Sequence, residues 1–411
     1  MRASHDQSEG NGGLPRRRFL GYLGSAMAGA AAAAPATAAV LGDHASGAEV
    51  SPRPAGETWS PYGVHQAGIT QPMPRFVELV ALDLHAEVDR AALGRLLRQW
   101  TGDIVTLTQG RPAPGDTAPE LSVSAANLTI TVGLGPEVFR GDLATLRPAG
   151  LVRVPPMRHD RLRDEWTGGD VVLAVAASDG TTVTHAVRRL VSDAAPFARL
   201  RWRQTGFWNG LDDKGQAMTG RNLFGQVDGS GNPRMGTPVF DATVWIDDAL
   251  WTGGSTLVVR RIRLDLDTWD ELTRDEQERA VGRRLRDGAP LTGGGELDDL
   301  DLLATDNGGR LLIPEHAHSR RAHPSLNRGR RIFRKGANYT REVTNAPGAK
   351  IESGLLFLSF QADIGDQFVP LQQALDESDA LNDWTTAIGS AEFAILPGFE
   401  AGGWLGSQIF G

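Results

Sequence analysis

The sequence predicts an α+β fold in two domains, with antiparallel sheets and flanking helices. Two observations lead to this prediction. The chain has 411 residues, and at about 100 to 200 residues per domain this is enough for two domains with real hydrophobic cores. Along the chain, strand-like alternation of apolar residues gives way to helical spacing and back again, and a first set of elements is followed by a second of the same kinds.

The first set contains elements in the order strand, helix, strand, strand, helix, strand. Alternating positions or short apolar runs predict the strands, and apolar residues at helical spacing predict the helices. The predicted ranges are Arg75–Leu84, Asp89–Trp100, Leu128–Val132, Asp170–Ala177, Thr182–Val191 and Leu200–Phe207. Asp89 is the expected N-cap of the first helix. This order is the split β-α-β arrangement of ferredoxin-like domains.

The second set is predicted from the same patterns in the C-terminal half of the chain. Its strands are expected at Ala242–Ile246, Ser255–Leu266 and Gly354–Gln361, and its helices at Leu266–Arg286 and Phe368–Asp379. A second ferredoxin-like domain would account for the length, so we expect domains at residues 61–220 and 221–411. The duplication is inferred from the order of elements, because the sequence shows no repeat.

The N-terminal segment has the layout of an export signal. Residues 16–20 read RRRFL, an apolar and Ala-rich stretch covers residues 21–41, and the A-T-A at 36–38 offers a cleavage site. This layout predicts a twin-arginine-type signal peptide at residues 1–42 and a linker at 43–60. We therefore expect export by the Tat machinery to a secreted or extracytoplasmic location. The alternative is an N-terminal membrane anchor.

The composition excludes several classes of site. The chain contains no Cys, so it has no disulfide framework, Cys-ligated zinc, iron–sulfur cluster, Cys nucleophile or covalent haem attachment through a CxxCH motif. A cofactor must therefore be held by His, carboxylates, backbone groups or the walls of a pocket. The formal net charge of −8 argues against a general nucleic-acid binder.

A segment rich in His and Arg is the first candidate site. Asp287–Asn327 is expected to form a long loop, and loops of this length inside compact domains are usually functional. His316, His318 and His323 crowd its end, and Arg310–Arg341 contains nine Lys or Arg residues against one acidic residue. This local reversal of charge suggests an anionic ligand such as phosphate, a carboxylate or haem propionates. A His–carboxylate metal site and a solvated surface loop are the alternatives.

Two further segments are candidate parts of a site. Asp228 lies between Gly225 and Gly229, and Asn232-Pro233 follows. Taken alone, this pattern predicts turns, but glycines on both sides of one acid also let backbone pack against a flat ligand. The apolar run Gly354–Gln361 is able to wall a cavity, although core packing is the default for such a strand.

These segments together resemble the dye-decolorising peroxidase family. The family's GxxDG motif matches Gly225–Gly229, and its H-I/V-R-x-A-x-P segment matches His318–Pro324. Its R-I/L-x-R-R/K-G-x-x-Y/F segment matches Arg331–Tyr339, and its GLLFxxxQ strand matches Gly354–Gln361. Each motif is moderately specific, but their order and co-occurrence, from about residue 60 to residue 398, are highly specific.

The resemblance implies two ferredoxin-like domains of the dimeric α+β barrel type, with one non-covalent haem b in the C-terminal domain. It implies His318 as the axial ligand of the haem iron, Asp228 as the distal acid–base residue and Arg334 as the distal arginine. The further residues expected at the cofactor are Arg320, which would meet a haem propionate, Gly229, Leu355 and Phe357.

Near the expected iron ligand, one residue departs from the family pattern. Two assignments have alternatives: the ligand itself and its hydrogen-bond partner. Ser319 stands where the family has an aliphatic residue, which affects packing beneath the haem but removes no ligand. His316 competes with His318 by spacing alone, and the register of the motif favours His318. A carboxylate or amide is expected to hold the second nitrogen of the ligand His. Glu377 and Asp379 are both candidates.

The implied function is a haem b peroxidase that reduces H2O2 and oxidises bulky one-electron donors such as dyes and phenolics. The alternative on the same fold is a haem-binding protein that releases iron from haem or carries haem. An interpretation from another class is a secreted, haem-free module that binds anions or polysaccharides through the Arg/His loop. No stable membrane insertion is expected after processing, and a homo-oligomer is compatible with the sequence.

Overall fold

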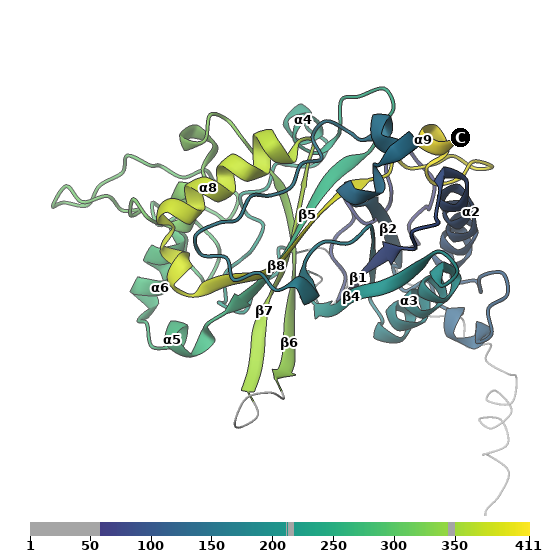
Figure 1. Cartoon of the computed structure of the whole chain (residues 1–411). Coiled ribbons are helices and arrows are strands. Elements are labelled where there is room, and N and C mark those ends of the chain that lie inside the picture. The colour runs from purple at the N-terminus through teal and green to yellow at the C-terminus, as the bar shows by residue number, and fades with distance from the viewer. Residues whose placement is uncertain (1–57, 211, 213–217, 344–349) are drawn as a thin grey trace, which may run out of the picture. The chain divides into compact units, whose positions relative to one another are not determined.

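The computed structural model describes residues 58–210, 212, 218–343 and 350–411, and Figure 1 shows their secondary structure. The predicted signal peptide at residues 1–42, and most of the predicted linker at 43–60, lie outside the described residues. In the ranges that the structure describes, no helix is long and apolar enough to cross a membrane.

The first half of the described chain folds in the predicted order. Its strands are β1 (Phe76–Leu84), β2 (Thr129–Leu134), β3 (Val171–Ala177) and β4 (Ala198–Phe207), and its main helices are α2 (Arg90–Leu107) and α3 (Gly180–Ala194). The strands pair antiparallel in the order β4-β1-β3-β2, which we call the N-terminal half-sheet. The ferredoxin-like arrangement predicted for this half is confirmed.

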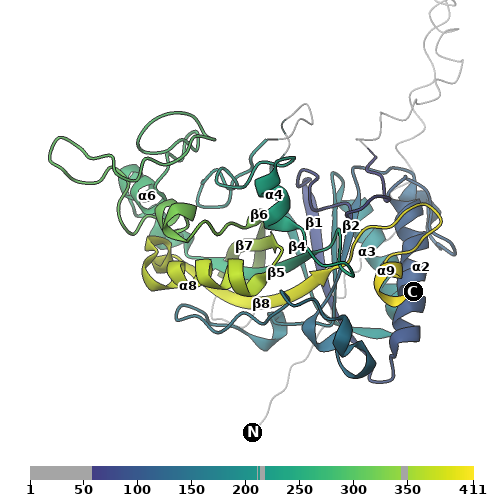
Figure 2. The ribbon, with the colours of Figure 1, turned by 90° about the horizontal axis from the view of Figure 1, so that it is seen from above.

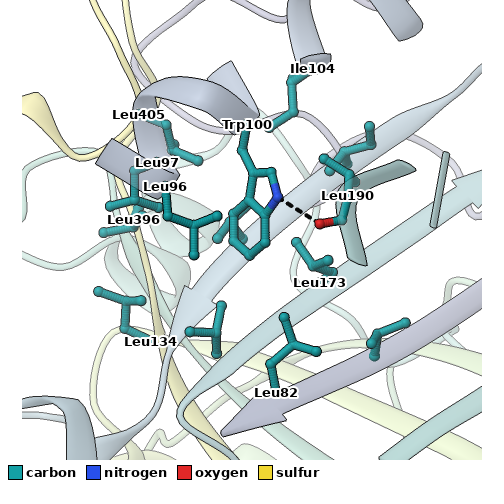
Figure 3. Close-up of a cluster of buried hydrophobic side chains, with 14 of the residues drawn as sticks. Leu82, Leu96, Leu97, Trp100, Ile104, Leu134, Leu173, Leu190, Leu396 and Leu405 are labelled. Carbon is teal, nitrogen blue, oxygen red and sulfur yellow. Dashed lines mark hydrogen bonds between the residues drawn. The ribbon is translucent and has the colours of Figure 1, made fainter. Parts of the chain in front are cut away.

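Both helices of this half begin at a capping residue. Asp89 Oδ1 accepts a hydrogen bond from the Ala92 backbone N–H at 2.7 Å, and Asp179 caps α3 in the same way. The two helices contact each other, and α3 contacts β1 and β3 (Figures 1 and 2). Trp100 of α2 is fully buried among leucines, and its indole N–H donates to the Leu190 carbonyl oxygen of α3 at 2.9 Å (Figure 3).

The second half repeats the same order of elements. Its strands are β5 (Ser255–Leu264), β6 (Phe333–Val343), β7 (Lys350–Gln361) and β8 (Thr385–Ile395), and its main helices are α5 (Leu266–Asp270), α6 (Arg274–Val281) and α8 (Val369–Ser378). The strands pair antiparallel in the order β8-β5-β7-β6, which we call the C-terminal half-sheet. This order matches the N-terminal half-sheet strand for strand, so the inferred duplication is present in the fold.

Two short pairings connect the half-sheets. β2 pairs with β8 at Gly133–Ile395 and Leu134–Ala394, and β4 pairs with β6 at Phe207–Asn338. Within each half the ladders are longer, and β6 and β7 run side by side over their whole length (Figure 1). Most hydrogen bonds of the strands therefore lie within the half-sheets.

The strand predicted at Ala242–Ile246 is wrong, because most of this segment belongs to helix α4 (Pro238–Val244). The β-branched residues suggested a strand, but the residues before them start a helix. Thr237 Oγ1 accepts from the Phe240 backbone N–H at 3.2 Å, and Pro238 occupies the first helical turn, where its missing N–H costs nothing. Phe240 and Val244 are then buried on one face.

The single helix predicted at Leu266–Arg286 is also wrong, because the segment forms the two helices α5 and α6. The second helix has its own start, where Thr273 and Glu276 form a reciprocal capping box. It ends at Gly282, whose φ of +85° is the left-handed conformation that favours glycine at a helix end. Local capping residues therefore outweigh the continuous helical spacing of the apolar residues.

Several described elements were not predicted. The strands β6 and β8 are the largest of them. The predicted loop at Asp287–Asn327 contains helix α7 (His318–Arg321) near its end. The remaining short helices are α9 (Ser407–Phe410), the 3-10 segments Pro119–Ser122, Pro136–Val138, Gly141–Leu146, Asp164–Trp166, Pro324–Leu326 and Ala380–Asp383, and the π-helical turn Ile364–Phe368.

Candidate active site

The C-terminal half contains a cavity of about 250 Å³. Its wall includes most of the residues that the sequence motifs predict for the site: Asp228, His318, Arg334, Leu355 and Phe357. They come from the loop before α4, from α7, from β6 and from β7. The fold therefore brings together segments that are more than one hundred residues apart in the sequence.

His318, at the start of α7, is oriented by a carboxylate. Its Nδ1 lies 2.6 Å from Asp379 Oδ2. Because a carboxylate accepts, the neutral imidazole carries its proton on Nδ1 and keeps the lone pair on Nε2. Among the described residues, Nε2 makes no hydrogen bond, so this nitrogen is available to a ligand in the cavity.

Asp379 is fixed by the end of α8. Its Oδ1 accepts from the Leu381 backbone N–H at 3.0 Å, and its side chain is 5 % exposed. Of the two candidate partners of His318, Asp379 makes the contact, whereas Glu377 lies 3.8 Å from Arg321 and is largely exposed.

The competing histidine lies elsewhere. His316 is exposed and is not part of the cavity wall. Its backbone carbonyl oxygen accepts from the Ala380 N–H at 2.8 Å. This hydrogen bond connects the loop before α7 to the residue that follows Asp379. His316 thus supports the position of His318 through its backbone and does not face the cavity.

Asp228 lies in a tight loop on the cavity wall. Its Oδ2 accepts a hydrogen bond from Asn222 Nδ2 at 3.3 Å. The buried Asn222 in turn accepts from the backbone N–H groups of Phe224 and Gln226 through its Oδ1, so the loop holds the amide in place. Gly225, with a φ of +81°, lies in this loop in a conformation that favours glycine.

Arg334, near the start of β6, faces Asp228. Its Nη2 lies 3.8 Å from Asp228 Oδ1, and the two side chains are 22 % and 14 % exposed. Arg283 also lies on the cavity wall, and burial together with the charge of Arg334 lowers the pKa of its guanidinium. An acid and a fixed positive charge therefore share one part of the cavity.

The rest of the wall is partly apolar. Leu355 and Phe357 point from the same face of β7, as residues two apart in a strand do. The ring of Phe357 lies 6.4 Å from that of Phe368, centroid to centroid. This part of the wall fits a flat, apolar ligand.

Two predicted site residues are not on the cavity wall. Gly229 follows Asp228 but does not line the cavity, and Arg320 Nη1 donates instead to the Leu302 carbonyl oxygen at 2.6 Å. Sequence reasoning gave no role to Arg330 and Arg331, which do line the wall. Arg331 opens the matched R-I-F-R-K-G segment, and this position was the signal available in the sequence.

The donor set fits a haem. One imidazole nitrogen with a free lone pair, apolar walls and several arginines are the groups that hold an iron atom, a porphyrin face and carboxylates. The alternative of a metal ion held by protein side chains alone finds no support in the described residues, where no three His or carboxylate side chains gather as ligands.

Two family models match the chain in sequence order. The model for the N-terminal domain of Dyp-type peroxidases matches residues 66–208, and the model for the C-terminal domain matches residues 219–400. The second match contains every residue discussed at the cavity.

Individual relatives agree with these models. A dye-decolorizing peroxidase of Thermobifida fusca is 36 % identical over 97 % of this chain and 97 % of its own. A deferrochelatase of Yersinia pseudotuberculosis is 34 % identical over 82 % of this chain and 81 % of its own.

Solved structures give the same result. A DyP-type peroxidase from Cellulomonas bogoriensis is 44 % identical and covers 87 % of this chain and 99 % of its own, with a TM-score of 0.80. DtpA from Streptomyces lividans, solved as an oxyferrous/water mixed complex, is 37 % identical and covers 87 % of this chain and 98 % of its own, with a TM-score of 0.83. The chain belongs to the Dyp-type peroxidase family.

Proposed function

We propose that this protein is a haem b peroxidase that reduces H2O2 and oxidises bulky one-electron donors such as dyes and phenolics. One observation carries the proposal: the cavity wall holds both an imidazole oriented by Asp379 and the acid–arginine pair Asp228 and Arg334. The dye-decolorizing and oxyferrous relatives support the donor class and the iron-containing cofactor.

His318 would bind the haem iron through Nε2. The hydrogen bond to Asp379 fixes the ring and makes the ligand nitrogen more basic, which is the usual effect of a carboxylate on a metal-bound imidazole. When bound, haem supplies the redox chemistry of the reaction. Leu355 and Phe357 would contact its apolar surface.

Asp228 and Arg334 would act on the peroxide. When the O–O bond of H2O2 breaks, one oxygen has lost its proton and the other gains that proton and leaves as water, and a single carboxylate can do both transfers. A carboxylate oxygen of Asp228 would hold this proton, with Asn222 keeping the side chain in place. The guanidinium of Arg334 stays cationic and would stabilise the negative charge that develops on the oxygens.

The arginines of the wall would meet the carboxylates of the cofactor. The family motif assigns this role to Arg320, whereas the geometry supports Arg331, because Arg331 lines the cavity. Bidentate hydrogen bonds between arginine and carboxylate are strong and directional. The two assignments make different predictions for the corresponding variants.

The purified holoprotein provides the test. Its visible spectrum should show a Soret band that changes on addition of H2O2. In stopped-flow experiments, Asp228→Asn and Arg334→Leu should each slow this change by about 100-fold or more, because each removes one catalytic group. If neither substitution slowed the change, the roles assigned to these two residues would be wrong.

Iron release is a second candidate function, because the chain is similar to curated deferrochelatases over most of its length. This activity would act on haem itself, so it makes a separate prediction. Incubation of the protein with haem should yield fluorescent, iron-free porphyrin. Absence of porphyrin, together with turnover of H2O2 and a donor, would leave peroxidase as the activity.

We also propose that the protein is exported in folded form by the Tat machinery. The RRRFL sequence at residues 16–20 and the Ala-rich stretch after it support this proposal. Replacing Arg16 and Arg17 by Lys should keep the protein in the cytoplasm in a cell fractionation experiment. Unchanged export of this variant would contradict the proposal.

A further inference from the structure

The side chain of Asn232 holds the backbone of Arg334. Its Nδ2 donates to the Arg334 carbonyl oxygen at 2.8 Å, and its Oδ1 accepts from the Arg334 backbone N–H at 3.0 Å. Asn232 itself is half-buried and does not line the cavity. The sequence predicts a turn at Asn232-Pro233, shortly after the GxxDG motif.

The contact has the geometry of a strand pairing in which one partner is a side chain. Arg334 lies opposite Ser359 in the β6–β7 ladder. In an antiparallel strand, the N–H and C=O of one residue point to the same side, and those of Arg334 point to Asn232 and therefore away from β7. On that side of β6, the strand β4 pairs only at Phe207–Asn338 in the described chain. The amide of Asn232 thus takes the place of a neighbouring strand.

Asn232 is also tied to Asp228. Its backbone N–H donates to the Gly229 carbonyl oxygen at 2.9 Å, and the Asp228 N–H donates to Gly220 at 2.9 Å. Gly229 has a φ of +140°, a conformation that L side chains rarely adopt. A short, hydrogen-bonded turn therefore connects the carboxylate to the amide that holds Arg334.

We propose that Asn232 is a positioning residue that sets the approach of Arg334 to Asp228. The inference rests on the proposed peroxidase function, in which these two side chains act on one peroxide molecule. Their 3.8 Å contact joins a loop and a strand that are 102 residues or more apart, and Asn232 bridges them with two hydrogen bonds. Without the amide, the loop loses both hydrogen bonds to Arg334 and keeps a bond to β6 farther along the strand, from Asn338 Nδ2 to the Arg221 carbonyl oxygen at 2.9 Å.

The test compares two reactions of the holoprotein. Asn232→Ala should slow the reaction with H2O2 by about 10- to 100-fold, since a displacement of about 1 Å has effects of this size. The rate at which ferrocyanide reduces the peroxide-treated protein should stay within about twofold of the wild type, because neither Asn232 nor Arg334 is proposed to act in that step. If Asn232→Ala does not fold, Asn232→Asp is the second variant. It keeps the acceptor for the Arg334 N–H, places an oxygen against the Arg334 carbonyl oxygen in place of the donor, and should slow the same reaction.

Gln66 provides a matched control. Its side-chain amide makes the same pair of hydrogen bonds to the backbone of Val132 in β2, at 2.8 and 2.9 Å, and neither residue is part of the cavity wall. Gln66 Nε2 also donates to the Leu396 carbonyl oxygen at 2.8 Å. Gln66→Ala should lower the thermal midpoint as Asn232→Ala does and leave the peroxide rate unchanged. Equal slowing by both variants would indicate a general loosening of the fold and would overturn the proposal.

A double-mutant cycle separates positioning from stability. If Asn232 acts through Arg334, Asn232→Ala should cause no further slowing in an Arg334→Leu background. Additive slowing, or a wild-type peroxide rate in the single variant, would overturn the proposal. A wild-type protein that shows no reaction with H2O2 would instead overturn the proposed function, so the two failures are distinguishable.

Discussion

His318 Nδ1 and Asp379 Oδ2 lie 2.6 Å apart, and the two residues come from different helical segments of the C-terminal half. The carboxylate is nearly buried, while the imidazole is 24 % exposed and borders the cavity. One side chain thus supplies the lone pair and the other determines its direction. The pair also defines which nitrogen of the imidazole would bind iron.

Replacing Asp379 by Asn should weaken haem binding. The amide keeps the shape and removes the negative charge, so the imidazole becomes a less basic ligand. We expect a loss of about 10- to 100-fold in haem affinity or peroxide reactivity and a more positive reduction potential. Spectroelectrochemistry and haem titration measure these changes. Glu377→Gln is the control, because Glu377 lies beside Arg321 on the surface, and equal effects of both substitutions would contradict the assignment.

The two neighbouring histidines should behave differently. His318→Ala should abolish the Soret band of the purified protein, because the cavity loses its iron ligand. His316→Ala should retain the band, because this side chain is exposed and only its backbone contacts Ala380. The absorbance ratio of the Soret band to the protein band is the measurement. The reverse result would make His316 the ligand.

Substitution of Arg331 and of Arg320 should have different effects on the rate of haem release. Arg331→Leu should release haem to an excess of haem-free globin about tenfold faster or more, as expected for the loss of a hydrogen bond to a charged group. Arg320→Leu should leave the release rate close to that of the wild type, because Arg320 is bonded to Leu302 outside the cavity wall. If only Arg320→Leu accelerated release, the role given by the family motif would hold.

A buried carboxyl pair should make stability depend on pH. Burial and the neighbouring Asp193 raise the pKa of the Asp103 carboxyl to about 8, against an opposing effect of Arg189. Between the ordinary value of 3.8 and this value, the native state binds more protons than the unfolded state, so stability falls as the pH rises. Asp103→Asn removes this dependence and keeps a hydrogen-bond donor toward Asp193.

The variant should therefore be more stable than the wild type, by about 1 kcal/mol or more at pH 8 and by less at pH 5. Urea denaturation at the two pH values measures the difference. Asp142→Asn, at an exposed position in the same half, should change stability little at either pH. Parallel pH profiles for the wild type and Asp103→Asn would show that Asp103 is ionised in the native state.

Much of the fold could be predicted because the helix-capping residues and the spacing of apolar residues in the sequence agree with the helices and buried faces of the structure. Asp89 and Asp179 cap helices whose apolar faces follow helical spacing. In the N-terminal half, β1, β2 and β3 are largely buried apolar runs, and β4 alternates buried and exposed positions. β6 was missed because the polar side chains of Arg334, Lys335 and Asn338 break the apolar pattern of a strand, and the first of them lines the cavity. The errors at α4 and at α5–α6 arose where capping residues outweighed the average pattern.

The site shows a similar division. Family motifs placed Asp228, His318 and Arg334, and the structure puts all three on one cavity wall. The choice between Glu377 and Asp379 could not be made from the sequence, because it depends on how the last turn of α8 ends. The same holds for Arg320 and Arg331, since the direction of a side chain leaving a short helix or loop is set by packing.

The pairing between β2 and β8 affects how the protein is made. Leu134 of β2 pairs with Ala394 of β8, which is synthesised roughly 260 residues later. Until then, the edge of the N-terminal half-sheet that β2 forms has no partner strand. At the usual rates of synthesis, the ribosome needs on the order of 15 to 50 s to deliver that strand. During this interval the nascent N-terminal half presents an open strand edge. Cells that express the protein rapidly should therefore depend on chaperones that shield the edge until translation ends.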